Sequence, residues 1–374
     1  SQSLHAGIEQ RRYMIDRRLH QFVRVFFYRV KIVRKTRTHT IFSNFFSTIF
    51  PHLPEERRRR FSDRRDSKIH FSLQKSPIPQ RITIFVRFCR GTMDEKKILH
   101  VDVEEVVRRK SPRLARKIPK CVFNFIKRTI QEERINRFLK AYSHKRGVDF
   151  AETLLEYLDI SIRLDGEQNI PEQGRFIFAS NHPLGGLDGV ALIAVLGRKY
   201  NRNIKFVVND LLMAIEPLSD NFLPINKYGK QDKDKADALG KAYEGDGQMA
   251  VFPAGLVSRR QGAEIKDLTW NKAFIAKSVQ YQRDVIPVWF EGYNSPFFYR
   301  FARWRKRLGL KFNIELIYLP DEMFRSEKKR FIIHFGKPIP WQTFDNSKSR
   351  MEWAQYVKDQ VYSIRDNLNK PKRI

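Results

Sequence analysis

Short apolar runs alternate with amphipathic stretches over most of the chain. Eight runs rich in Val, Ile and Phe predict strands at 161–164, 175–179, 205–208, 223–225, 249–252, 285–290, 313–318 and 331–335. Apolar residues at helical spacing predict helices at 187–198, 232–243, 268–280 and 351–367. Strands that alternate with helices indicate the α/β class, with a mixed, largely parallel central sheet flanked by helices.

A helical region precedes the first predicted strand. The pattern predicts helices at 101–110, 114–130, 131–143 and 149–158, with Asp149 as the N-cap of the last. The helix at 114–130 is basic and amphipathic. We therefore expect a helical N-terminal segment over 93–147, followed by an α/β domain over 148–374.

The first 92 residues differ in character from the rest. They contain 21 Lys and Arg against 6 Asp and Glu, and they show no sustained helical or strand period. We expect residues 1–92 to be a basic, disordered extension, or to be sequence upstream of a native start at Met93. A basic, aromatic extension that binds a membrane or nucleic acid is the third interpretation.

The net charge of +31 over 374 residues predicts adhesion to an anionic partner, either nucleic acid or a membrane surface. No apolar segment approaches the roughly 20 residues needed to span a bilayer. The 2 cysteines lack CxxC spacing and the histidines do not cluster, so we expect neither a disulfide framework nor a bound metal. Phosphate-loop, nucleophile-elbow and zinc-helix motifs are missing from the sequence.

The stretch 180–189 carries the strongest candidate chemistry. It lies between a predicted buried strand and a predicted helix, a corner where α/β proteins build their sites. Asp188 can accept a hydrogen bond from one ring nitrogen of His182 and leave the other to take a proton from an incoming hydroxyl or amine. This stretch places no covalent nucleophile, so direct attack by the acceptor is the simpler mechanism. The alternative is a helix-start turn with a capping Asp188 and a core His182.

The loop 252–260 carries a second signal. It leaves a predicted buried strand with a Gly turn, followed by Ser258, Arg259 and Arg260. Exposed backbone N–H groups with guanidinium groups suit a phosphate or carboxylate. The alternative is an ordinary loop with two solvated arginines.

Two further strands complete the pattern. In the run 222–227, Lys227 follows the end of a predicted strand, so a cation is expected at that strand end. The strand 285–290 contains Pro287, which predicts an edge position or a bulge because proline lacks a backbone N–H.

In their order, these four stretches resemble the glycerophospholipid (PlsC-like) acyltransferase superfamily. Its members carry Asn-His…Asp, a strand ending in Ile-Asp/Asn-Arg, Phe-Pro-Glu-Gly-Thr-Arg-Ser and a strand with a Val/Ile-Pro step, and the resemblance covers roughly residues 150–345. It implies transfer of an acyl group from an acyl-carrier protein or coenzyme A thioester, as co-substrate, to a lipid hydroxyl, with no bound cofactor. It also implies that His182 is the general base and that Asp188 orients it.

The same resemblance gives a predicted substrate-binding set, in which Lys227, Gly255 and Ser258 fall in the acceptor-binding region. The full set is Asn181, Gly185, Gly186, Asn226, Lys227, Phe252, Pro253, Gly255, Ser258 and Arg259. Pro287 is predicted to be structural at the site.

The first motif departs from the family pattern in its spacing. Five residues separate His182 from Asp188, where the family usually has four. The turn must therefore bulge for the two side chains to meet. Gly185 and Gly186 can supply the positive φ values that such a turn needs.

Ala254 and Val257 replace the glutamate and the frequent arginine of the family motif. This variant resembles the bacterial hemolysin-like subgroup, some of whose members O-acylate N-acyl amino acids to make ornithine or glycine lipids. We expect a 1-acylglycerol-3-phosphate type of lysolipid acceptor, with an N-acyl amino acid as the alternative. An inactive basic protein that binds membranes or nucleic acid is the alternative of a different class.

Membrane contact is expected because both substrates of such an enzyme are amphiphilic. The stretch 296–312 interleaves aromatics with cations at helical spacing, which predicts a helix in the headgroup interface of an anionic membrane. The alternative is a helix packed on its own sheet, and 114–130 is a second membrane-binding candidate. We expect a peripheral protein on the cytoplasmic face of the inner membrane, with no specific nucleic acid partner.

Overall fold

The computed structural model describes residues 100–110, 112–116, 118–209, 212–213, 215–225, 233–310 and 313–368. The predictions for residues 1–92, Asn226 and Lys227 lie outside the described residues. Residues 118–125 belong to one compact unit of the chain. The remaining described residues belong to another unit, which contains the sheet and every described residue of the predicted site.

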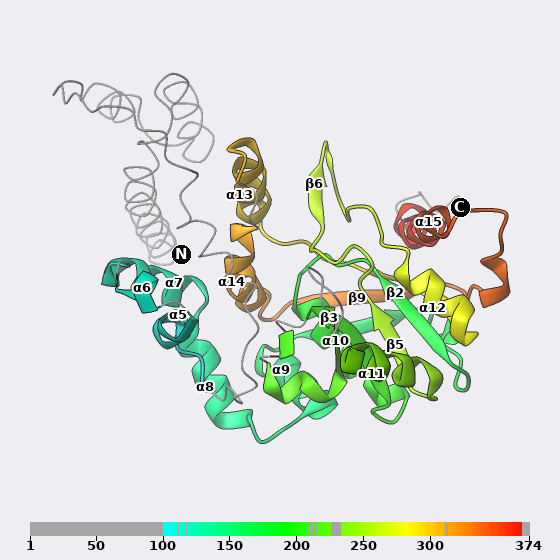
Figure 1. The fold of residues 1–374 in the computed structure, drawn as a ribbon, viewed down its shortest axis with the longest axis horizontal. Coiled ribbons are helices and arrows are strands. Elements are labelled where there is room, and N and C mark those ends of the chain that lie inside the picture. The colour runs from blue at the N-terminus through cyan, green and yellow to red at the C-terminus, as the bar shows by residue number, and fades with distance from the viewer. Residues whose placement is uncertain are drawn as a thin grey trace, which may run out of the picture. The chain divides into compact units, whose positions relative to one another are not determined.

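Seven strands form one mixed sheet (Figure 1). They are β1 (Ser161–Asp165), β2 (Phe176–Ser180), β3 (Ile204–Asn209), β4 (Phe222–Ile225), β5 (Gln248–Val251), β8 (Asp284–Phe290) and β9 (Arg330–Phe335). Their order is β1-β9-β8-β2-β5-β3-β4, and every neighbouring pair is parallel except β8 and β9. The mixed, largely parallel sheet predicted from the sequence is confirmed.

Helices cover both faces of this sheet. One layer consists of α9 (Gly147–Tyr157) and α10 (Leu187–Lys199), and the other of α11 (Lys233–Glu244), α12 (Ala273–Tyr281) and α15 (Arg350–Leu368). Alternate residues of β2 serve opposite layers: Phe178 packs with the α9–α10 layer, whereas Ile177 and Ala179 pack with the other. Every residue of β2 is buried, as is typical of a strand covered on both faces.

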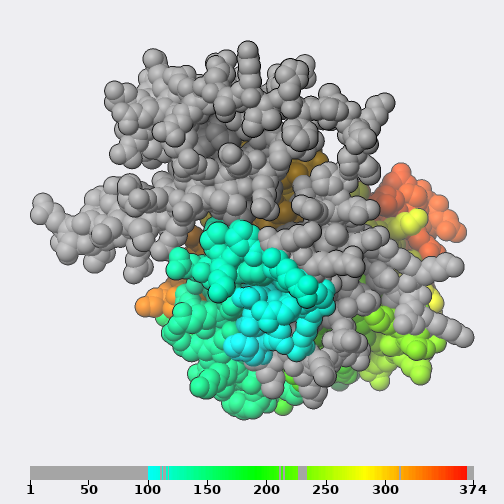
Figure 2. All heavy atoms as spheres, turned by 60° about the vertical axis from the view of Figure 1, so that its left-hand side comes forward, coloured from blue at the N-terminus to red at the C-terminus, as the bar shows by residue number. Residues whose placement is uncertain are grey.

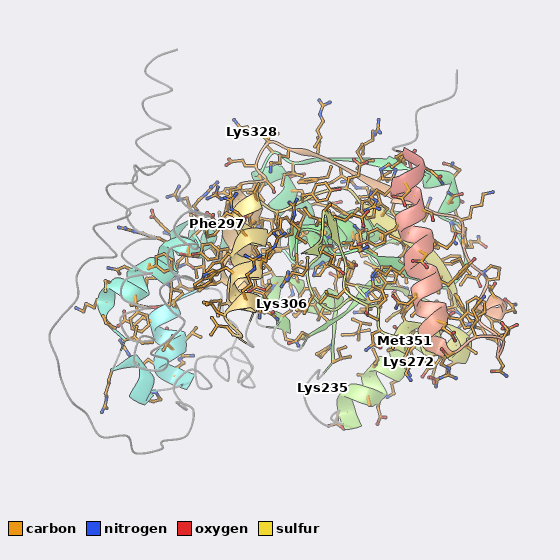
Figure 3. The ribbon with its side chains drawn as sticks, turned by 90° about the horizontal axis from the view of Figure 1, so that it is seen from above. Lys235, Lys272, Phe297, Lys306, Lys328 and Met351 are labelled. Carbon is orange, nitrogen blue, oxygen red and sulfur yellow. The ribbon has the colours of Figure 1, made fainter. Side chains whose placement is uncertain are left out.

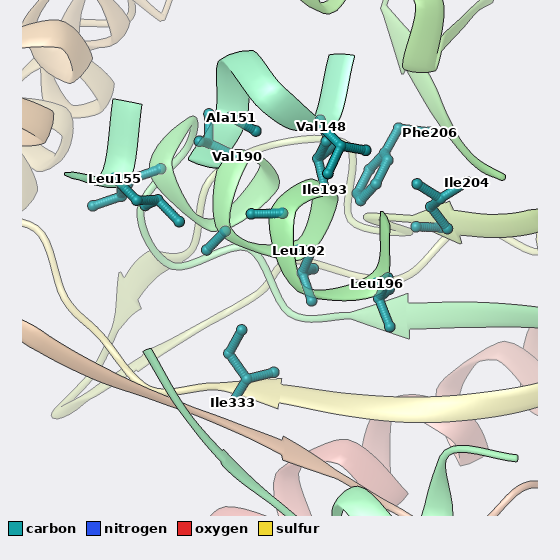
Figure 4. Packing of buried hydrophobic residues seen from close by; sticks show 14 of the residues in the cluster. Val148, Ala151, Leu155, Val190, Leu192, Ile193, Leu196, Ile204, Phe206 and Ile333 are labelled. Carbon is teal, nitrogen blue, oxygen red and sulfur yellow. The ribbon is translucent and has the colours of Figure 1, made fainter. Parts of the chain in front are cut away.

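The packing of α10 fixes the position of its first turn. Leu192 and Leu196 are completely buried and point from α10 toward the sheet, where Ile333 of β9 faces them (Figure 4). On its other side α10 lies very close to α9, since a Cβ on Gly197 would be 2.3 Å from the Val148 side chain. These contacts hold the start of α10 relative to the end of β2, where the predicted site lies.

Four described helices precede α9: α5 (Val103–Lys110), α6 (Pro112–Ala115), α7 (Lys120–Thr129) and α8 (Glu132–Tyr142). Figure 2 shows α5 and α8, cyan to teal, at the molecular surface. The single helix expected at 114–130 is wrong, because α7 begins only after Pro119, whose fixed φ and missing N–H suit a helix start. Asp149 is not the N-cap of α9, since Arg146 takes that position and Asp149 lies in the first turn.

Two segments near the site differ from the predicted elements. The strand expected at 313–318 is wrong: Ile314–Tyr318 is a 3-10 helix (η4) that leads into α14 (Leu319–Phe324). It buries Glu315 in ion pairs with Arg259 and Arg305, as a buried charge requires. The sequence pattern also missed a hairpin of β6 (Arg259–Gln261) and β7 (Glu264–Lys266).

Pro287 does not lie on an edge strand. It sits in β8, between β2 and β9, so of the two predicted positions the edge is wrong, and the bulge agrees with the pairing next to Pro287. The interior position is tolerated because the pairing between β8 and the segment after β9 is irregular there. Between the Val288–Phe335 pair and the Val285–Ile339 bridge, the segment after β9 has one residue more than β8. The carbonyl of Pro287 still accepts the N–H of Gly336 at 2.8 Å.

Candidate active site

The predicted catalytic residues lie where two neighbouring parallel strands end. β2 ends at Ser180, β5 ends at Val251, and the two strands pair with each other. His182 follows β2 and Phe252 follows β5, and their rings stack with centroids 4.1 Å apart. The carboxyl ends of parallel strands meet at one edge, which is the usual place for a site in an α/β protein.

Asp188 holds one ring nitrogen of His182. Its Oδ2 lies 2.9 Å from His182 Nδ1, and the aspartate is completely buried in the first turn of α10. The carboxylate also accepts backbone N–H groups from Leu184 (2.9 Å), Gly185 (3.3 Å) and Gly189 (2.9 Å). Burial opposes the ionised form, but the charge of His182 and these hydrogen bonds outweigh burial and hold the pKa of Asp188 below its usual value.

The second ring nitrogen of His182, Nε2, can accept a proton. Because an ionised Asp188 can only accept, Nδ1 carries the proton and Nε2 of the neutral ring has a lone pair. The His182 side chain is 15% exposed, so the ring reaches the surface. Burial disfavours the charged ring, but the charge of Asp188 and its hydrogen bond more than reverse this and raise the pKa of His182. A neutral His182 can thus accept a proton, and the protonated ring is stabilised by a buried carboxylate.

Gly185 lets the chain turn back on His182. Its φ is +81°, and a Cβ at this position would lie 2.5 Å from Val257 and 2.8 Å from Leu319. Gly186 is different, because its φ is −165° and an added Cβ would meet nothing within 4 Å. Of the two glycines expected to supply positive φ, only Gly185 does so.

The loop 252–260 contacts the His182 loop through its serine. Ser258 is buried, its N–H donates to the carbonyl of His182 at 2.8 Å, and its hydroxyl donates to Asp267 at 2.5 Å. The loop turns at Gly255, where φ is +61°, and Pro253 just before it is buried. The Ser258 hydroxyl therefore points into the protein, and its predicted place in acceptor binding stays a prediction.

Asn181 extends the ladder between β2 and β8 with its side chain. It is buried, its amide donates to the carbonyl of Phe290 at 3.0 Å, and its Oδ1 accepts the N–H of Phe290 at 2.7 Å. These two bonds fix the residue directly before His182. The predicted contact of Asn181 with substrate stays a prediction.

Arg259 belongs to a buried group of three charges. It donates to Glu315 at 2.8 Å and to the carbonyl of Val257 at 2.9 Å, and Arg305 lies 2.9 Å from the second oxygen of Glu315. Burial lowers the pKa of Arg259, Arg305 lowers it further, and Glu315 opposes the change. Two cations around one anion leave a net positive charge beside the loop 252–260, although Glu315 and the backbone occupy several Arg259 donors.

Sequence patterns missed three residues that shape this site. Asp267 binds the His182 loop, Glu315 pairs with Arg259, and Asn294 donates to the carbonyl of Pro183 at 3.1 Å. Their partners lie 85, 56 and 111 residues away along the chain, so no local motif could reveal them.

Within the described part of the chain, no group of three His, Cys, Asp or Glu side chains could hold a metal ion. Asn226 and Lys227, which were predicted to bind substrate, lie outside that part.

Gly185→Ala and Gly186→Ala form a matched pair that tests the turn. We expect Gly185→Ala to lower the free energy of unfolding by about 1–2 kcal/mol from the left-handed conformation alone, with a further loss from the clash with Val257. We expect Gly186→Ala to change it by no more than about 0.5 kcal/mol. Chemical unfolding of both variants measures the difference, and equal losses would show that the turn does not depend on Gly185.

Comparison with known proteins identifies the family. Residues 105–371 match a family model described as Acyltransferase. The chain is 49% identical to a lyso-glycine lipid O-acyltransferase of Bacteroides thetaiotaomicron over 272 residues, which are 73% of this chain and 100% of that protein. It is 46% identical to a lyso-glycine lipid O-acyltransferase of Phocaeicola vulgatus, over 73% of this chain and 98% of that protein.

Among solved structures, the chain is similar to the crystal structure of the 1-acyl-sn-glycerophosphate acyltransferase PlsC from Thermotoga maritima. That match has a TM-score of 0.38 and 15% identity, and it covers 60% of this chain and 80% of the other. The family match and the two bacterial relatives confirm the resemblance seen in the four motifs. The chain belongs to the acyltransferase family and is an acyltransferase.

Proposed function

We propose that the protein transfers an acyl group to the hydroxyl of a lyso-glycine lipid, with His182 as the general base. The observation that carries the proposal is the His182–Asp188 pair at the sheet edge, in a chain 49% identical to an enzyme named for that acceptor. Glycine has no side-chain hydroxyl. The acceptor hydroxyl must therefore lie on the acyl chain that is bound to the glycine nitrogen.

The proposed reaction needs no covalent enzyme intermediate. Nε2 of His182 takes the proton of the acceptor hydroxyl while its oxygen attacks the carbonyl carbon of the donor thioester. The tetrahedral intermediate collapses, the carbon–sulfur bond breaks, and the proton passes from Nε2 to the leaving thiolate. Asp188 stabilises the positive ring in between and keeps its orientation.

The state of the base sets the expected pH dependence. Only a neutral His182 can take the proton, so kcat/KM should rise with pH through the pKa of His182 and then level off. We call the part of the profile in which kcat/KM rises with pH the acid limb. Because the pKa of His182 is raised, the midpoint of the acid limb should lie at a higher pH than for an ordinary histidine. A coenzyme A thioester and an acyl-carrier protein thioester both fit as donors.

The acceptor choice rests partly on charge. The 1-acylglycerol-3-phosphate acceptor expected from the family carries a phosphate, whereas an N-acylglycine carries one carboxylate. Ala254 and Val257 replace polar residues of the family motif, and Arg259 is paired with Glu315. The positive charge left near the loop suits a single carboxylate better than a phosphate, which favours the glycine-lipid alternative.

Membrane binding is proposed through cations rather than aromatics. In α13 (Pro296–Arg307) the rings of Phe298, Tyr299 and Phe301 are buried and cannot contact lipid, whereas Phe297 and Trp304 are partly exposed. The predicted membrane contact of this stretch stays a prediction. Four cations of the helix are exposed: Arg300, Arg303, Lys306 and Arg307. These four residues, the α13 cation stripe, can attract anionic headgroups. No described helix is long and apolar enough to cross a bilayer.

The acceptor and the base are tested in one assay with purified protein. We expect ester formation from acyl-coenzyme A and an N-acylglycine with a hydroxylated acyl chain, at a higher kcat/KM than with 1-acylglycerol-3-phosphate. We expect His182→Gln to lower kcat by about 10²- to 10⁴-fold. His144→Gln, at an exposed position outside the site, is the control and should leave kcat unchanged. A preference for 1-acylglycerol-3-phosphate would contradict the acceptor, and full activity of His182→Gln would contradict the base.

The α13 cation stripe is tested by co-sedimentation with vesicles that contain an anionic phospholipid. We expect Arg303→Gln with Lys306→Gln to weaken binding roughly tenfold or more at low salt. The control pair, Lys241→Gln with Lys272→Gln, removes two exposed cations, one in α11 and one at the N-cap of α12, and Figure 3 shows Lys272 apart from Lys306. An equal loss in both pairs would mean that net charge, and not the α13 cation stripe, determines binding.

A further inference from the structure

Asp267 is a second buried carboxylate at the site, and the proposed chemistry does not use it. It follows β7, its side chain is completely buried, and Ser258 donates a hydroxyl to its Oδ1 at 2.5 Å. The same Oδ1 accepts the backbone N–H of His182 at 3.3 Å. Trp270 Nε1 donates to Oδ2 at 2.9 Å.

These bonds hold the His182 peptide from two sides. Its N–H points to Asp267, and its carbonyl accepts the N–H of Ser258 at 2.8 Å. Because the Ser258 hydroxyl also binds Asp267, the three residues form a closed set of hydrogen bonds. The set joins the end of β2, the loop after β5 and the segment after β7.

The backbone of Asp267 is fixed independently of its carboxylate. Its N–H donates to the hydroxyl of Tyr362 at 2.6 Å, and its carbonyl accepts from Lys358 Nζ at 2.9 Å. Both partners belong to α15, which also contributes Val357 and Val361 to the core. The backbone of this segment is therefore anchored to α15 by hydrogen bonds that do not involve the Asp267 carboxylate.

We propose that Asp267 is a positioning residue for acyl transfer, which holds the His182 peptide and, through its negative charge, favours the protonated ring that forms during the reaction. The inference rests on the proposed role of His182 as the base. Ser258 becomes the link between the two loops, and its hydroxyl is used in this link rather than on the acceptor.

The charges that face His182 give this role a measurable consequence. Asp188 and Asp267 both favour the protonated ring, and Arg259 opposes it. Burial raises the pKa of Asp267 above its usual value, and the donors Ser258 and Trp270 and the charge of His182 offset this rise only in part. Two titratable groups of α15 face Asp267: the Lys358 ammonium and the Tyr362 hydroxyl. Loss of the Asp267 charge should therefore lower the pKa of His182 and increase the fraction of neutral base at acid pH.

Three variants separate position from charge. Asp267→Asn removes the charge and keeps the shape; we expect kcat to fall about 10- to 100-fold, as for a catalytic group displaced by up to about 1 Å. We also expect little change in either KM and an acid limb of kcat/KM that moves to lower pH. Ser258→Ala removes the link but keeps the charge, so kcat should fall while the acid limb stays in place. Asp267→Glu should likewise keep the limb of the parent enzyme.

Glu322→Gln is the matched control. Glu322 is also a buried carboxylate that accepts a hydroxyl and a backbone N–H, both from Ser295, but it does not contact the His182 loop. Its substitution should lower the melting temperature without moving the acid limb.

The inference is overturned if Asp267→Asn keeps the parent kcat, or if it loses stability with an unmoved acid limb as Glu322→Gln does. If Asp267→Asn does not fold, Ser258→Ala decides: an unchanged kcat would overturn the positioning role. Failure of the proposed function looks different, because full activity of His182→Gln would remove the base whatever the Asp267 variants do. All assays use the full chain, acyl-coenzyme A and the hydroxylated N-acylglycine.

Discussion

The hydrogen bond between Asp188 and His182 is the interaction on which the site depends. A carboxylate without solvent contact is stable only when donors surround it, and Asp188 has three backbone N–H groups besides the imidazole. Those N–H groups come from the turn at Gly185 and the start of α10, where the helix dipole also favours a negative charge. The ring of His182 thereby receives one fixed tautomer and a raised pKa.

The sheet supplies the rest of the geometry. Because β2 lies between β8 and β5, the His182 loop has a neighbour on each side. On the β8 side Asn181 binds the backbone of Phe290, and on the β5 side Ser258 binds the carbonyl of His182. His182 is therefore attached to rigid strands rather than to a free loop, which limits the movement of its ring.

Local patterns predicted the parts of this protein that local physics determines. The buried strands, the helix after Gly186 and the His182–Asp188 pair each lie within a short stretch, and the motif order indicated the superfamily. Features set by distant partners could not be predicted. The interior position of Pro287 depends on an extra residue in the segment that pairs with β8. The role of Ser258 depends on Asp267, which lies beyond a hairpin that the sequence pattern did not predict.

Nitrogen-15 NMR of the protein with labelled histidine rings measures both the tautomer and the pKa of His182. The His182 signals can be assigned by their loss in His182→Gln. We expect that, above its pKa, His182 carries a proton on Nδ1 and none on Nε2, and that its raised pKa falls in Asp188→Asn. A neutral ring with its proton on Nε2, or a His182 pKa that does not respond to Asp188→Asn, would show that Asp188 does not set the state of the ring.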